Sequence, residues 1–401
     1  MKIGIIREGK TPPDSRVPLI PEQCAYVLAN FKGIDLCVQP SPIRCYSDDA
    51  YRHQNIALRA DLRDRDVLLG VKEVPIGELI PGKTYFFFSH TIKEQSYNRE
   101  LLRAVLDKNI RLIDYEVLTD DKGRRLIAFG KFAGMVGAHN GIMAYGARTG
   151  AFELPRMKDF LDYAEARGTY RQLQLPPMKI VLTGTGRVGN GAALVLRDMG
   201  IREASPKEFL QQEYDEAVFT QLRCEDYARR RSDGGFDKNE FYTYPERYES
   251  AFEPFSAASD LMINGIYWDN KAPAFFTREE MKAPAFRIKV IADVTCDIAP
   301  VSSIPATLRA STIADPIFGY DPVTGGETAA HQPQAIDMMT VDNLPNELPR
   351  DASKAFGKQF IEHILPELLK EHSPVIERAT IAENGQLGPH FQYLKAYAGL
   401  E

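Results

Sequence analysis

Residues 179–200, KIVLTGTGRVGNGAALVLRDMG, decide the fold that the sequence predicts. The apolar run IVLT is typical of a buried strand, and Gly184, Gly186 and Gly189 follow it as a G-x-G-x-x-G turn. Apolar residues then recur at helical spacing. A strand, a glycine turn and a helix in this order are the context that a dinucleotide-binding turn requires. The alternative is a glycine-rich turn in an α/β domain without a ligand.

Each glycine of this turn has a physical reason. Gly184 permits the tight turn, Gly186 lets a pyrophosphate approach the backbone, and Gly189 lets the helix pack against the strand. The helix N-terminus would present free N–H groups to the phosphates. We therefore also expect Arg187 and Val188, within the same turn, to contact the cofactor.

The residues that would select the cofactor follow the next strand candidate, AVFTQL. Its end offers Arg223, Glu225 and Asp226. Arg223 could stack on adenine or pair with a 2′-phosphate, which favours NADP, or it could be an ordinary exposed arginine. Either acidic residue could accept a hydrogen bond from a 2′-hydroxyl, which favours NAD. The expected cofactor is NAD(P), with NADP slightly favoured.

Two later strands of the same sheet are expected in DLMINGIYW and IKVIADVTCD. Asn264 and Asp293 lie near their carboxyl ends, where open α/β sheets bind ligands. Asp293 could touch the nicotinamide ribose or the substrate amine, or it could simply cap a turn. Ile266 and Tyr267, just after Asn264, complete the expected cofactor contacts.

The first part of the chain alternates short β-rich runs with helical patterns, which predicts a second parallel α/β unit. Three apolar runs end in ionisable residues: LLGVK at Lys72, FFFSH at His90 and LIDYE at Glu116. Because the carboxyl ends of parallel strands share one edge, we expect these side chains to converge in a cleft facing the nucleotide domain. Taken singly, His90 could be a hydrogen-bonded surface residue, and Lys72 with Glu73 a solvated pair.

These groups fit hydride transfer at a carbon that bears nitrogen, which needs a nicotinamide cofactor and acid–base groups. Histidine exchanges protons near neutral pH, and a lysine does so where desolvation or nearby positive charge lowers its pKa. Arg16, Lys93 and Arg125 lie in neighbouring loops and could hold substrate carboxylates.

The length of 401 residues and the ordinary globular composition suit a soluble cytoplasmic protein with two domains. A net charge of -6 argues against a nucleic-acid or membrane surface. Five cysteines without C-x-x-C spacing argue against disulfides and a metal site. The N-terminus is too charged for a signal peptide, and no apolar stretch approaches the ~20 residues of a membrane span.

The chain resembles the saccharopine dehydrogenase (lysine-forming) group of the alanine dehydrogenase–transhydrogenase superfamily, particularly the lysine–2-oxoglutarate reductase domain of bifunctional aminoadipic semialdehyde synthases. The most specific matching stretches are SHTIKEQ, NGIYW and DNLPNELP. Weaker matches extend from Arg7 to ATIAENGQLG near the C-terminus.

The resemblance implies two Rossmann-like, doubly wound α/β domains with a cleft between them. The substrate domain would comprise residues 1–134 plus 318–401, and the NAD(P)-binding domain residues 135–317. Lysine and 2-oxoglutarate would join through an imine that NAD(P)H reduces to saccharopine.

The resemblance also implies roles for residues of the first domain and for one aspartate. Lys72 and His90 match the family's acid–base pair, Asp293 matches an aspartate near the cofactor, and four residues match positions that hold the substrate or tune that pair: Arg16, Lys93, Glu116 and Arg125.

Two other functions also fit these residues. An alanine dehydrogenase-like enzyme would act on pyruvate and ammonia and would carry similar residues at the ends of its strands. A nucleotide-binding regulator without activity would bind the cofactor but turn over no amino or oxo acid. Neither the oligomeric state nor the physiological direction follows from the sequence.

Overall fold

The computed structural model describes residues 1–400 and divides them into two compact units. We call Met1–Phe129, together with the segment that begins at Pro349, the terminal unit. Gly130–Leu348 forms the central unit. Within residues 1–400, no helix is both long enough and apolar enough to cross a membrane.

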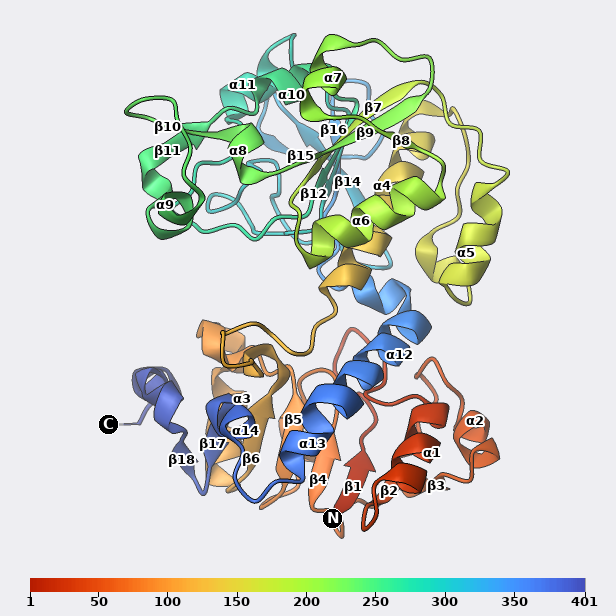
Figure 1. The fold of residues 1–401 in the computed structure, drawn as a ribbon, viewed down its shortest axis with the longest axis vertical. Coiled ribbons are helices and arrows are strands. Elements are labelled where there is room, and N and C mark those ends of the chain that lie inside the picture. Colours follow the sequence, from red (N-terminus) through yellow and green to blue (C-terminus); the bar gives the residue numbers. More distant parts are fainter. Residues whose placement is uncertain (401) are drawn as a thin grey trace. The chain divides into compact units, whose positions relative to one another are not determined.

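The terminal unit is built on a mostly parallel sheet (Figure 1). Its parallel strands are β1 (Lys2–Ile5), β2 (Asp35–Val38), β3 (Ala57–Leu58), β4 (Val67–Leu69), β5 (Thr84–Phe87) and β6 (Arg111–Asp114). Two antiparallel strands, β17 (Thr380–Glu383) and β18 (Gln386–Leu387), extend the sheet beyond β6. The order is β18-β17-β6-β5-β4-β1-β2-β3. The chain therefore reverses its direction of winding between β1 and β4.

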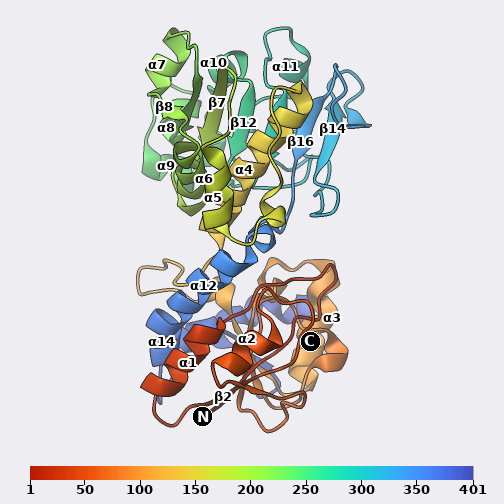
Figure 2. The ribbon, with the colours of Figure 1, turned by 90° about the vertical axis from the view of Figure 1, so that its right-hand side faces the viewer.

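Helices cover both faces of this sheet. They are α1 (Pro21–Asn30), α2 (Asp48–His53), α3 (Arg99–Asp107), α12 (Pro349–Gln359), α13 (Leu365–Leu368), α14 (Pro374–Ala379) and α15 (Lys395–Ala398). Figure 2 shows α1 and α12 on one side of the terminal unit and α3 on the other. Phe86 and Phe88 pack into the core under α1 and α12, whereas Tyr85 and Phe87 pack under α3. The aromatic run is continuous because both faces of β5 are buried.

The central unit also contains a mostly parallel sheet. Its strands are β7 (Met178–Thr183), β8 (Arg202–Glu203), β9 (Ala217–Leu222), β12 (Leu261–Asn264), β13 (Val290–Asp293), β14 (Ile317–Asp321), β15 (Gly326–Thr328) and β16 (Ile336–Met339). The order is β15-β14-β16-β13-β12-β7-β9-β8, and β14 and β15 are the antiparallel members. The direction of winding reverses between β7 and β12, so the glycine turn after β7 stands at the switch point.

The remaining elements of the central unit are mostly short helices. They are α4 (Gly130–Thr149), α5 (Tyr163–Tyr170), α6 (Arg187–Asp198), α7 (Pro206–Gln211), α8 (Cys224–Tyr227), α9 (Lys238–Thr243), α10 (Glu253–Ala258) and α11 (Arg278–Lys282). A separate hairpin pairs β10 (Ala228–Arg230) with β11 (Tyr248–Ser250).

Two long helices of the central unit cross at glycines. A Cβ on Gly134 of α4 would lie 1.9 Å from the carbonyl oxygen of Val188, and one on Gly191 of α6 would lie 2.1 Å from that of Lys131. The backbones of α4 and α6 therefore touch, and only glycine permits this approach.

The division of the chain differs from the expected boundaries at 134/135 and 317/318. The chain first passes from the terminal unit to the central unit at Gly130, where α4 begins. It passes back after Leu348, because β14 pairs with β16, which in turn pairs with β13. These strands extend the central sheet, and the chain returns to the terminal unit only at α12.

Candidate functional site

The strand tips singled out in the sequence do share one edge of the terminal sheet. Strands β4, β5 and β6 are parallel and in register, with Leu69 opposite Phe86 and Phe87 opposite Asp114. Lys72, His90 and Glu116 therefore follow three adjacent strands at their carboxyl ends. This edge also borders the switch point between β1 and β4, where sheets of this kind bind ligands.

His90 is held by a buried carboxylate. Its Nδ1 lies 2.6 Å from Oε1 of Glu73, and Lys10 Nζ lies 2.9 Å from the other oxygen of the same carboxylate. Burial raises the pKa of Glu73, but hydrogen bonds and positive charge from His90 and Lys10 outweigh it and lower the pKa to about 2. Glu73 therefore stays ionised and fixes the orientation of the imidazole.

Lys72 lies in the same cluster and is partly buried. Burial, followed by the positive charges of Arg16 and Lys10, lowers the pKa of Lys72 to about 8. Its amine can therefore gain or lose a proton close to neutral pH. This is the property that a proton-exchanging lysine needs.

The backbone that carries Lys72 is fixed by Glu8. The two carboxyl oxygens of Glu8 accept hydrogen bonds from the N–H groups of Val71 and Lys72, at 2.7 and 2.8 Å. Burial, reinforced by the charge of Asp14, raises the pKa of Glu8 to about 8.

The substrate-binding candidates form two groups. Glu116 Oε1 lies 3.7 Å from Lys93 Nζ and 3.8 Å from a guanidinium nitrogen of Arg125, so the structure brings these three residues together. Arg16 is 3% exposed, and its Nε and a terminal guanidinium nitrogen donate to the carboxylate of Asp14 at 2.9 and 2.5 Å. Its guanidinium also lies 4.3 Å from the centre of the Phe129 ring.

Sequence reasoning missed three members of this cluster: Glu8, Lys10 and Asp14. All three follow β1 at its carboxyl end, in the stretch REGKTPPDSR. The strand-end argument that found Lys72 and His90 would have found Glu8 and Lys10 had it been applied to the first strand.

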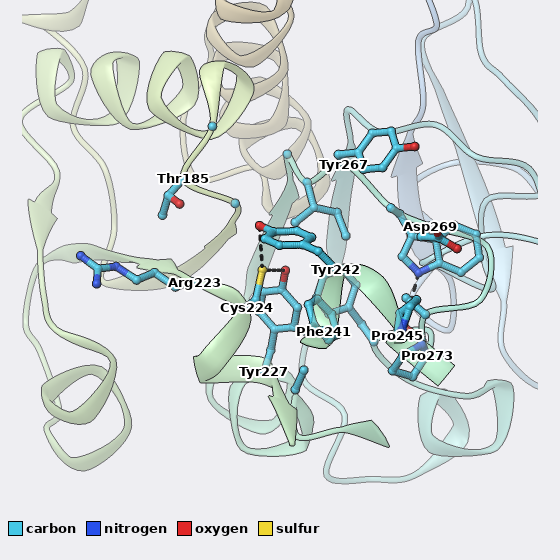
Figure 3. Close-up of a pocket in the computed structure, with 18 of the residues that line it drawn as sticks. Thr185, Arg223, Cys224, Tyr227, Phe241, Tyr242, Pro245, Tyr267, Asp269 and Pro273 are labelled. Carbon is cyan, nitrogen blue, oxygen red and sulfur yellow. Dashed lines mark hydrogen bonds between the residues drawn. The ribbon is translucent and has the colours of Figure 1, made fainter. Parts of the chain in front are cut away.

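The central unit has a cavity beside its glycine turn (Figure 3). Its volume is about 480 Å³, within the range of about 300–1,000 Å³ typical of small-molecule sites. The expected cofactor residues that line it are Gly184, Gly186, Arg187, Val188, Arg223, Ile266 and Tyr267. Gly189, Asn264 and Asp293 lie outside this lining.

The glycine turn has the geometry that a pyrophosphate needs. Gly184 has φ +94°, in the region that favours glycine, and a Cβ on Gly189 would lie 1.9 Å from the carbonyl oxygen of Gly184. A Cβ on Gly186 would meet no atom within 4 Å, so this position opens onto free space at the start of α6. The residues present therefore fit a dinucleotide phosphate at this helix N-terminus.

Asn264 and Asp293 form an internal network. The Asn264 side-chain amide donates to Asp293 Oδ1 at 2.9 Å, and the Thr307 hydroxyl donates to Asp293 Oδ2 at 2.6 Å. Both Asn264 and Asp293 are fully buried. Burial raises the pKa of Asp293 against the opposing effect of these hydrogen bonds. In this arrangement the pair braces the ends of β12 and β13.

At the end of β9, Asp226 and Arg223 have different surroundings. Asp226 Oδ2 accepts a hydrogen bond from the backbone N–H of Arg223 at 2.7 Å and so caps α8. The Arg223 guanidinium lies 3.7 Å from Glu225, and both side chains are exposed. Figure 3 shows the Arg223 side chain extended away from Tyr227 and Tyr242.

An aromatic wall of the cavity was not anticipated. It consists of Tyr227, Phe241 and Tyr242, with Cys224 among them. The Tyr227 hydroxyl donates to the Cys224 sulfur at 3.3 Å, and the Tyr242 hydroxyl lies 3.6 Å from it. Phe241 and Tyr242 come from α9, which the β10–β11 hairpin flanks.

Comparison with known proteins first identifies the fold. Residues 4–136 match the family model "Alanine dehydrogenase/PNT, N-terminal domain". A solved L-alanine dehydrogenase aligns over 99% of both chains with a TM-score of 0.69 and 16% identity. A transhydrogenase from Sinorhizobium meliloti aligns over 96% of this chain and all of that one, with a TM-score of 0.59 and 15% identity. The chain has the two-domain Rossmann-like fold of the alanine dehydrogenase–transhydrogenase class, as expected.

The sequence relatives are more specific. The mitochondrial alpha-aminoadipic semialdehyde synthase of Mus musculus is 30% identical over 98% of this chain and 47% of its own length. The saccharopine dehydrogenase [NAD(+), L-lysine-forming] of Candida glabrata is 26% identical over 94% of this chain and 95% of its own. The chain spans about half the length of the synthases it matches. The chain is a homologue of the lysine-forming saccharopine dehydrogenases and of these synthases, which confirms the resemblance found in the sequence.

Proposed function

We propose that this protein is an NAD(P)-dependent oxidoreductase that acts on a C–N bond and interconverts saccharopine with lysine and 2-oxoglutarate. The observation that carries the proposal is the cluster at the terminal sheet edge, where Lys72 has a pKa near 8 beside a His90 oriented by Glu73. The names of the relatives support the same reaction.

In this proposal Lys72 and His90 divide the proton transfers. His90, held by the ionised Glu73, protonates the oxygen that leaves as water when the lysine amine condenses with the oxo group. Lys72 exchanges a proton with the substrate nitrogen as the resulting imine becomes a secondary amine. When bound, the reduced nicotinamide supplies the hydride for that step. The reverse reaction uses the same groups with their protonation states exchanged.

The nearby cations would hold the substrate carboxylates. Lys93 and Arg125 both face Glu116, which sets their positions and partly balances their charge. We assign them to substrate carboxylates, together with Arg16. Arg16 is already bound to Asp14, so the pair offers a rigid guanidinium and not a mobile one.

For the cofactor we propose NADP over NAD. The carboxylate of Asp226 caps α8 and is therefore committed to the backbone, whereas Arg223 is exposed at the end of β9. An exposed arginine at this position suits a 2′-phosphate. Asn264 and Asp293 would then support the loops around the cofactor from inside the unit.

A second candidate function is that of an alanine dehydrogenase. The family match over residues 4–136 and the fold similarity favour it. It would use the same cofactor and the same strand tips with ammonia and pyruvate. A regulator without activity would bind the cofactor alone. We propose a cytoplasmic location, which suits five unpaired cysteines.

The test follows oxidation of NADPH and NADH with lysine plus 2-oxoglutarate, with ammonia plus pyruvate, and with each component alone. We expect oxidation only when lysine and 2-oxoglutarate are both present, faster with NADPH, and lost in a Lys72→Met/His90→Gln double variant. Turnover of ammonia and pyruvate instead would select the alanine dehydrogenase reading. Cofactor binding without turnover would withdraw the substrate assignment.

A further inference from the structure

The loop that carries His90 and Lys93 is strained and exposed. Residues 90–98, the strand-tip loop, leave β5 and enter α3. His90 and Glu94 both have φ 53°, and between them runs a single 3-10 turn, Thr91–Lys93. Left-handed backbone at residues other than glycine persists only where the surroundings hold it. The structure must therefore contain restraints on this loop.

The beginning of the loop is anchored from the core. Asp114, which is fully buried, accepts hydrogen bonds from the backbone N–H and the hydroxyl of Ser89, at 2.9 and 2.5 Å. The Ser89 hydroxyl in turn lies 2.8 Å from that of Thr91. This anchor reaches Thr91 and leaves Lys93 beyond it.

Further restraint comes from the far end of the chain. Tyr393 donates its hydroxyl hydrogen to the carbonyl oxygen of Ile92 at 3.4 Å, and Tyr397 donates to that of Gln95 at 2.5 Å. These two bonds flank Lys93 and join residues about 300 positions apart along the chain. Both are made to the backbone, so they restrain the path of the loop whatever its side chains do.

The segment that supplies the tyrosines is itself firmly packed. Within residues 389–398, which we call the C-terminal segment, Phe391, Leu394 and Ala398 are buried in the apolar core under α3. Arg103 of α3 donates from Nε to the carbonyl oxygen of Ala398 at 2.8 Å. Figures 1 and 2 show the chain end beside α3. The tyrosine rings therefore project from a fixed support.

We propose that Tyr393 and Tyr397 are positioning residues that latch the strand-tip loop and so hold Lys93 in place for the carboxylate-bearing substrate. The role in substrate binding rests on the function proposed above. The latch itself rests on the two backbone hydrogen bonds. Loss of one well-formed hydroxyl-to-carbonyl bond, such as that of Tyr397, shifts an equilibrium by roughly fivefold, and the longer bond of Tyr393 adds a smaller restraint.

The variant to test is Tyr393→Phe/Tyr397→Phe in the full chain, which keeps both rings and removes both hydroxyls. Tyr26→Phe, at an exposed tyrosine of α1, is the matched control. We expect the Michaelis constant for 2-oxoglutarate to rise roughly fivefold to twentyfold. The turnover number and the Michaelis constant for NADPH should stay within about twofold, because both rings keep their packing and the removed hydroxyls bond only to the backbone of the loop.

A second readout needs no activity. Trypsin cleavage after Lys93 in the folded protein should accelerate by a similar factor in the double variant, because cleavage follows the population of the open loop. Cleavage after Arg124, which lies in another exposed turn, serves as the internal reference. Mass spectrometry of the first fragments separates the two sites.

Each outcome has a definite meaning. Unchanged cleavage after Lys93 relative to Arg124 overturns the latch. Faster cleavage with an unchanged Michaelis constant overturns the positioning role. If the wild-type protein does not turn over lysine and 2-oxoglutarate, the proposed function fails, and the cleavage rates alone decide whether the latch exists.

Discussion

Nδ1 of His90 lies 2.6 Å from Oε1 of Glu73, and the two residues come from the ends of adjacent parallel strands. The sheet topology predicts that residues at these strand ends lie close together, and this hydrogen bond shows that His90 and Glu73 do. The carboxylate fixes which ring nitrogen faces the protein and leaves the other for the substrate.

Glu73→Gln should lower kcat by about tenfold to a hundredfold, because the amide neither stabilises a charged imidazole nor fixes its tautomer. Steady-state kinetics with lysine and 2-oxoglutarate provide the measurement. Glu78→Gln, at an exposed residue paired with Arg7 on the same stretch of chain, should change kcat by less than twofold. Equal losses in both variants would remove Glu73 from the mechanism.

The rate of saccharopine oxidation should depend on Lys72 through pH. The folded protein lowers the pKa of Lys72 to about 8, so the neutral amine that accepts the substrate proton predominates above that pH. We expect kcat/KM for saccharopine to rise with pH through about pH 8 and to level off above it. Lys72→Arg, which stays charged throughout, should lose this limb. A limb that persists in Lys72→Arg would assign the ionisation to another group.

Glu8 should make the folded state less stable as the pH rises. Folding raises its pKa from 4.5 to about 8, so between these values the folded state binds more protons than the unfolded state. Its contribution to stability is therefore complete below about pH 4.5 and is lost as the pH rises through 8. Lys72, whose pKa is lowered from 10.5, acts in the opposite direction and only above about pH 8.

Urea unfolding between pH 5 and pH 8 tests this sign. Glu8 should make the free energy of unfolding fall by on the order of a few kcal/mol between pH 5 and pH 8, and Glu8→Gln should remove this fall. The exposed Glu22 of α1 provides a control, since Glu22→Gln should leave the slope unchanged. Parallel slopes in wild type and Glu8→Gln would contradict the assignment.

Gly186→Ala should separate cofactor binding from folding. Its Cβ would meet no protein atom within 4 Å, so the melting temperature should stay within about 2 °C. The same methyl group would stand where the pyrophosphate approaches, and the dissociation constant for NADPH should rise at least tenfold. Fluorescence titration of the cofactor measures it.

Substitutions at two other glycines serve as comparisons for Gly186→Ala. Gly189→Ala would drive a Cβ to 1.9 Å from the Gly184 carbonyl oxygen and should destabilise the protein by about 1–3 kcal/mol. Gly168→Ala, in α5 with open space around it, should be neutral or stabilising by about 0.5–1 kcal/mol and should leave cofactor binding intact. Unimpaired binding in Gly186→Ala would move the phosphates away from this turn.

Local patterns predicted much of this architecture. The strand, glycine turn and helix around Gly184 could be predicted because the residues that form them are neighbours in the chain. The positions of Lys72, His90 and Glu116 were predictable for a related reason. Each follows an apolar strand that ends in an ionisable residue, and parallel strands bring their carboxyl ends to the same edge of the sheet.

Other features depend on partners that the local sequence does not reveal. The bonds from Glu8 to the backbone of Val71 and Lys72 span more than 60 residues. Asp226, a candidate ribose ligand in the sequence, also accepts a hydrogen bond from the backbone of Arg223 and so caps α8. Strand β14 joins the central sheet in the antiparallel sense, which the alternating α/β pattern does not encode, and this moves the return of the chain to Leu348.

The division of the chain also sets an order for folding during synthesis. The central unit is one uninterrupted segment, whereas the sheet of the terminal unit needs β17 and β18, and its core needs α12, all translated after residue 348. On the ribosome, the first 129 residues therefore cannot complete their fold before the central unit has been synthesised and can fold. A nascent chain stalled after residue 348 has emerged should yield a protease-resistant central fragment and a sensitive N-terminal one. Equal resistance of both would show that the early strands fold without the late ones.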